Sequence, residues 1–143
     1  MNGIWRESYD LRYAGPTFDA LIGNGGKLDT ESIRREIERR LGDLLSDEGD
    51  PYSGETTPKW WTKTRSQAER WRENGFIEES KVYGTWQITA KGRESYKINR
   101  DFFIEQGWLK PNSERWELTD LGREKLKDTR SVRATVDDSE DFI

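Results

Sequence analysis

The sequence ENGFI at residues 73–77, followed by WQITAKGRE at residues 86–94, decides the fold of this chain because it occurs twice. The second copy reads EQGWL at residues 105–109 and WELTDLGRE at residues 116–124. In each copy a Gly ends a helical pattern, alternating residues flank a turn, and a Thr precedes the next helical pattern. We therefore expect each copy to form a helix end, a short β-hairpin and a new helix.

Helical patterns also precede the first copy. Residues 16–22 form a short first helix that ends at the glycine-rich break at residues 23–26. A second helix begins at Asp29 or Thr30, either of which can cap it, and its apolar residues lie on one stripe: Ile33, Ile37, Leu41, Leu44 and Leu45. A third amphipathic helix is expected over residues 59–74, where Gly75 is placed to end it in a left-handed cap.

The order of these elements predicts an α+β, mainly helical fold. It is a winged helix-turn-helix followed by a second half-unit of helix, short β-hairpin and helix. We assign residues 16–98 to the winged-helix domain and residues 99–130 to the second half-unit, packed on the first. The helix opened by Thr89 continues to Gln106 and so belongs to both, and a last helix is expected from Thr119 to Thr129. Residues 1–15 show no clear pattern, and we describe them as an unassigned N-terminal arm. We expect residues 131–143 to form an acidic disordered tail.

Composition limits the chemistry of this 143-residue chain. It contains no Cys and no His, so zinc fingers, thiol catalysis and Ser-His-Asp hydrolysis each lack an essential residue. We expect a protein that is not an enzyme and that needs neither a metal nor another cofactor. No apolar run reaches the length of a membrane span, which favours a soluble, cytoplasmic protein without membrane contact.

The charge is distributed unevenly along the chain. The formal net charge is −4, yet residues 59–130 carry 16 Lys and Arg against 12 Asp and Glu, a net of +4. Acidic residues are concentrated at positions 43–55 and 137–141. A basic middle between acidic ends is compatible with phosphate binding.

In a winged helix the second helix of the helix-turn-helix enters the major groove, and the wing contacts the backbone or the minor groove. Here these parts are residues 59–74 and the turn at residues 81–84. The helix combines side chains that read bases with lysines that bind phosphate. An ordinary solvated face is the alternative, which Glu69 and Glu73 favour. We expect DNA contacts from eight residues: Lys59, Thr62, Lys63, Ser66, Gln67, Arg70, Lys81 and Tyr83.

The segments at residues 33–41, 71–78 and 84–94 resemble the N-terminal winged-helix domain of Mrr-type restriction proteins. The ending GTWQITAKGRE at residues 84–94 is the most specific part of that resemblance. It implies a domain that guides a separate nuclease to double-stranded DNA, in some cases to DNA with modified bases. After Tyr96 only the second half-unit remains, so the resemblance implies DNA guidance without nuclease activity. The partner would be a nuclease, or the chain would act as a regulator of transcription.

Two further interpretations stay open at this point. Adjacent Trp60 and Trp61 cannot both face one core on a helix, so one of them packs under the long loop at residues 46–58 or offers an exposed surface on which a base stacks. The whole chain is alternatively a protein-interaction or dimerisation module that uses a winged-helix fold without DNA. In that case Phe102, Phe103 and Trp108 would pair two chains as a homodimer.

Overall fold

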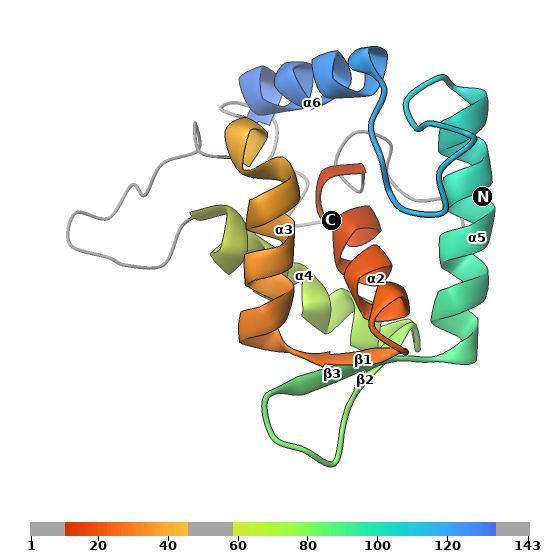
Figure 1. The fold of residues 1–143 in the computed structure, drawn as a ribbon. Helices are drawn as coiled ribbons and strands as arrows, with labels where there is room; N and C mark the ends of the chain where they lie inside the picture. The colour runs from red at the N-terminus through yellow and green to blue at the C-terminus, as the bar shows by residue number, and fades with distance from the viewer. Residues whose placement is uncertain (1–10, 46–58, 134–143) are drawn as a thin grey trace.

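The computed structural model describes residues 11–45 and 59–133 as an α+β fold that is mainly helical, with a small antiparallel sheet at one end of the helices (Figure 1). No helix in these ranges is long and apolar enough to cross a membrane. The elements are α2 (Ala14–Gly23), β1 (Lys27–Asp29), α3 (Thr30–Leu45), α4 (Lys59–Glu73), β2 (Ile77–Glu79), β3 (Thr85–Ile88), α5 (Ala90–Glu105) and α6 (Asp120–Arg133).

The sheet has three strands in the order β1-β3-β2, and both pairings are antiparallel. Leu28 of β1 lies opposite Trp86 of β3, and Ile77 of β2 lies opposite Ile88. The β2–β3 hairpin agrees with the sequence prediction, whereas β1 was not predicted. Three residues are too short to show an alternating pattern, and β1 exists because β3 supplies its hydrogen-bond partners from a distant part of the chain.

The helix ends follow the signals in the sequence. Asp29 caps α3, because its side chain accepts a 3.0 Å hydrogen bond from the backbone N–H of Ser32. Hydrogen bonding from Ser32 also lowers the pKa of Asp29. Gly75 has φ +80°, the left-handed conformation expected after α4, and Thr89 caps α5. These short-range signals predict the ends well because each depends on one or two neighbouring residues.

Aromatic side chains fill the core in two groups. Near the sheet, Phe18 of α2 meets Trp71 of α4 edge to face, with ring centroids 5.3 Å apart. Around α5, Phe103 contacts both Trp108 and Trp116, at 5.7 and 5.6 Å between centroids. Large aromatic rings contribute much of the core in a chain with only 31% hydrophobic residues.

Several predicted boundaries differ from the structure. Helix α2 begins at Ala14, two residues before the expected start, and α6 continues to Arg133, past the expected end at Thr129 and into the segment assigned to the tail. The second hairpin is reduced to a single antiparallel bridge between Leu109 and Leu118. Residues 1–10, the loop at residues 46–58 and the tail from residue 134 lie outside the described residues.

Candidate nucleic-acid interface

Helix α4 has a buried side and a solvent-exposed side. The buried side consists of Trp60, Trp61, Thr64, Gln67, Ala68 and Trp71, which recur at helical spacing. The exposed side follows the complementary spacing and consists of Thr62, Arg65, Ser66, Glu69 and Glu73. Lys63 and Arg70 are half-buried along one margin of that exposed side.

The eight residues of the predicted site differ in how exposed they are to solvent. Thr62 and Ser66 are exposed on α4, and Lys81 and Tyr83 are exposed at the hairpin tip. Lys59 begins α4, but its side chain lies outside the described part. The prediction for Gln67 is wrong: the side chain is only 5% exposed, because the turn of the helix places it next to Ala68 on the core side.

Arg65 is a basic residue of the exposed side that the sequence prediction missed. It lies three positions after Thr62 and directly before Ser66, so it belongs to the same face of the helix. That helical spacing could have predicted from the sequence that Arg65 is exposed beside Thr62 and Ser66. With Lys63 and Arg70 it brings three cations to this part of α4, against the two exposed carboxylates Glu69 and Glu73.

The hairpin tip between β2 and β3 projects from the sheet (Figure 1). The tip is closed by a 2.9 Å hydrogen bond from the N–H of Ser80 to the carbonyl of Thr85, and Gly84 adopts φ +77°. Val82 is 61% exposed and Tyr83 is fully exposed. Apolar side chains with this exposure contribute nothing to the core, so their position on a protruding turn is suited to contact with another molecule.

Arg72 fixes the hairpin relative to α4. Its guanidinium lies 3.4 Å from Glu79 of β2 and 5.9 Å from the ring centre of Trp86 on β3. A further ion pair joins Arg72 to Glu69 within α4 at 3.1 Å. Surface ion pairs of this kind are individually weak. Together with the stacking of Trp61 on Trp86, at 6.1 Å between centroids, they hold the helix and the hairpin as one surface.

Trp60 and Trp61 do not form an exposed stacking surface. Both are 4% exposed, and their rings meet edge to face at 5.8 Å between centroids. The interpretation that one of them is offered to an unpaired base is therefore wrong for this structure. The two indoles share one core because Trp61 reaches Trp86 of the sheet while Trp60 packs beside it.

Basic residues of the second hairpin pair with acidic residues of the same chain. Lys110 pairs with Glu117 at 3.1 Å, and this contact holds the pKa of Glu117 below its usual value. Arg115 donates to Asp19 of α2 and to Glu36 of α3, at 3.0 and 2.7 Å. The basic groups of this segment thus make contacts within the chain.

Asp19 is the centre of a buried polar network that joins α2, α3, α5 and the second hairpin. Its carboxylate is 2% exposed and accepts hydrogen bonds from Arg40, Arg115, the Tyr96 hydroxyl and the backbone N–H of Trp116. Burial and the charge of Asp19 raise the pKa of Tyr96 well above its ordinary value. A carboxylate with this many donors has no capacity left for a substrate, so the network is structural.

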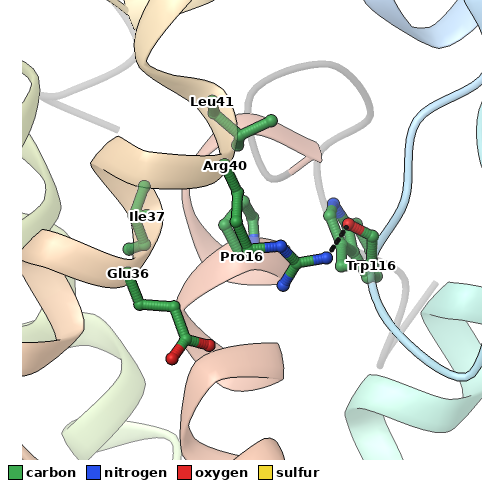
Figure 2. Close-up of a pocket in the computed structure, with 6 residues that line it drawn as sticks. All are labelled: Pro16, Glu36, Ile37, Arg40, Leu41 and Trp116. Atoms are coloured by element: carbon green, nitrogen blue, oxygen red, sulfur yellow. Dashed lines mark hydrogen bonds between the residues drawn. The ribbon is translucent and has the colours of Figure 1, made fainter.

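A cavity of about 10 Å³ lies beside this network. Figure 2 shows Arg40 reaching past Pro16 to donate a 3.0 Å hydrogen bond to the carbonyl of Trp116. Glu36, Ile37 and Leu41 complete the lining. The volume is below the range of ordinary ligand pockets, and the polar groups are already paired across it. The exposed side of α4 and the hairpin tip therefore remain the better site.

No protein-family model, no curated protein and no solved structure matches this chain.

Proposed function

We propose that this chain is a winged-helix protein that binds double-stranded DNA through α4 and the β2–β3 hairpin. The observation that carries the proposal is the arrangement helix, strand, helix, helix, hairpin with sheet order β1-β3-β2. This arrangement supports a winged helix, in which α4 would be the recognition helix and residues 80–84 the wing.

In this proposal the exposed side of α4 enters the major groove. Ser66 near the centre of that side and Arg65 at one margin would meet base edges, while Lys63 and Arg70 at the other margin would contact phosphates. Glu69 and Glu73 oppose phosphates nearby and would restrict the docking orientation. Lys81 and Tyr83 would contact the backbone or the minor groove beside the helix.

The biological role proposed with this activity is a regulator, or the specificity module of a restriction-like system whose nuclease is a separate protein. Sensing of modified bases is the narrower form of the second role. Its support is the resemblance to Mrr-type proteins, since the burial of Trp60 and Trp61 removes the stacking surface that also suggested it.

The alternative function is a protein-interaction module without DNA binding. The net charge of −4 favours it. The residues first considered for pairing two chains do not, because Phe103 is fully buried and Trp108 is 8% exposed. Any interaction surface must therefore be sought among other residues.

Double substitution of Lys63→Ala and Arg70→Ala tests the DNA-binding proposal. Loss of two phosphate contacts should reduce affinity for a 20–30 base-pair duplex by at least about tenfold near physiological salt. The matched control removes two exposed cations elsewhere, Arg39→Ala on α3 with Lys110→Ala in the second hairpin. Equal affinities of both variants and the parent would show that this placement of the site is wrong.

A further inference from the structure

Large exposed apolar side chains occur in three places on the described part of the chain. Val82 and Tyr83 belong to the hairpin tip, which the proposed function uses. The other two large exposed side chains are Ile98, 47% exposed in the middle of α5, and Leu121, 57% exposed in the first turn of α6. Leu121 lies against Gly107 at the end of α5, where a methyl group on that glycine would be 3.4 Å from its Cδ2.

Helix α5 forms an outer edge of the fold (Figure 1). Its buried side consists of Gly92, Ser95, Tyr96, Asn99 and Phe103. Ile98 lies near the margin of the exposed side, and Lys91 and Glu105 lie seven residues before and after it, both exposed. Seven residues are close to two helical turns, so all three share one stripe. A basic residue, an apolar residue and an acidic residue thus follow one another along the exposed edge.

We infer that α5 is a homodimer interface in which two copies pack antiparallel about Ile98. In that arrangement the two Ile98 side chains meet on the two-fold axis, and Lys91 of each copy faces Glu105 of the other. A two-fold interface must be self-complementary, and a stripe with opposite charges at equal distances from a central apolar residue meets that requirement. A parallel arrangement would instead place like charges together.

The other exposed residues of α5 set the strength of this contact. Glu94 and Asp101 of opposite copies come near each other, and the repulsion between these acids weakens the dimer, while Lys97 lies alongside both and offsets part of it. Lys91 now rests 5.6 Å from the ring centre of Phe76 and must turn towards the partner. One helix from each copy buries less than a standard interface of about 1,600 Å², so we expect a dimer with a dissociation constant on the order of micromolar.

The dimer would matter for DNA binding if the proposed function holds. Two α4 helices related by a two-fold axis would read an inverted repeat, with half-sites separated by a fixed number of base pairs. The dimer itself does not depend on DNA. Its test is therefore made without DNA, and its failure would leave the DNA proposal untouched.

Sedimentation equilibrium of the full chain across about 1–200 μM, a range that brackets the expected dissociation constant, tests the interface. The parent should change from monomer to dimer with concentration, and Ile98→Glu should stay a monomer. Val82→Glu is the matched control, because it puts the same charge on an exposed apolar side chain outside α5, and it should dimerise as the parent does. A parent that is monomeric throughout, or an Ile98→Glu variant that dimerises equally well, would overturn the proposal.

A charge exchange tests the antiparallel register. Lys91→Glu alone places two acids together, and Glu105→Lys alone places two lysines together, so each variant should dimerise at least about tenfold more weakly than the parent. An equimolar mixture restores both opposite-charge pairs and should form a heterodimer. Circular dichroism confirms that each variant is folded. Single variants that dimerise like the parent, or a mixture no better than its components, would contradict this register.

Discussion

The two copies of the repeated sequence form the same junction and then diverge. In each, the repeated Thr hydroxyl donates a hydrogen bond to the carbonyl of the Gly that ends the previous helix, Gly75 for Thr89 and Gly107 for Thr119. The same hydroxyl accepts a hydrogen bond from the backbone N–H three residues later, at 2.9 Å for Thr89 and 3.0 Å for Thr119. In each, the backbone N–H of that Thr donates to the carbonyl of the aromatic residue after the Gly, at 3.0 Å. The repeated residues therefore encode one backbone geometry twice.

The hairpins between these matched residues differ in structure. The first pairs with β1, extends a sheet and ends in an exposed tip. The second keeps a single bridge, and Trp116 turns inward, where its ring nitrogen donates to the carbonyl of Leu11 and its backbone N–H donates to Asp19. The local motif therefore sets the junction, whereas the available partner decides whether the hairpin joins a sheet or is reduced to a single bridge against the core.

The largest effect is expected from Asp19→Ala, which removes the carboxylate that joins the second hairpin to α3 and α5. Arg40 would lose its ion pair, Arg115 would keep only Glu36, and the N–H of Trp116 would lose its acceptor. We expect the free energy of unfolding to fall by about 3 kcal/mol, the low end for a broken buried pair because both guanidinium groups retain some solvent access. Urea denaturation measures it.

Glu114→Ala is the control for Asp19→Ala, since it removes an exposed acid from the second hairpin itself. It should change the free energy of unfolding by less than about 0.5 kcal/mol. If the two substitutions had equal effects, Asp19 would not be what holds the second hairpin to the core.

Gly92→Ala and Gly122→Ala should have the next largest effect, and the two losses should be alike. A methyl group at Gly92 would overlap the carbonyl oxygen of Phe76, and one at Gly122 would overlap that of Trp108. We expect each substitution to lower the free energy of unfolding by about 2 kcal/mol. Thermal and urea unfolding of the pair measure how closely the two junctions correspond.

Gly42→Ala controls for the change of residue type, because a methyl group there would meet only Glu38 Cγ at an ordinary 3.8 Å. In the interior of α3 it should stabilise the fold by up to about 1 kcal/mol. A tolerated Gly122→Ala beside a damaging Gly92→Ala would show that the second junction is not held as tightly as the first.

The smallest effect is expected from Thr89→Ala and Thr119→Ala, which remove the matched helix caps. Each should lower the free energy of unfolding by about 1 kcal/mol, because one backbone N–H loses its acceptor. Thr→Ser at either position keeps the hydroxyl and should restore most of the loss. Losses that Ser does not restore would show that packing of the methyl group, rather than capping, explains the repeated Thr.

The sequence predicts these junctions because their causes are local. Gly75 with positive φ and the capping Thr89 are both visible within a few residues of their effects. Strand β1 and the inward turn of Trp116 depend on partners in remote parts of the chain, namely β3 and Asp19. No local pattern marks such partners, which is why β1 was not predicted and the second hairpin was predicted with two strands rather than a single bridge.

In the predicted site, too, features with a local cause were predicted correctly, and a feature that depends on tertiary packing was not. The amphipathic pattern of α4 gave the correct exposed side for Thr62 and Ser66. It failed for Gln67, which lies at the boundary between the two sides and whose burial depends on how the helix is rotated against the core. Arg65 was missed although its spacing from Thr62 follows from the helical repeat alone.

The most direct test of DNA binding is the affinity of the full chain for duplexes with unmodified, adenine-modified and cytosine-modified bases, titrated across salt. Binding should weaken steeply as salt rises. The logarithm of the association constant should fall with the logarithm of the salt concentration with a slope of about −0.9 for each phosphate contacted. Preference for one modified duplex would support the restriction-like role. Absence of binding to every duplex at low salt would contradict the account and leave protein interaction as the function of the fold.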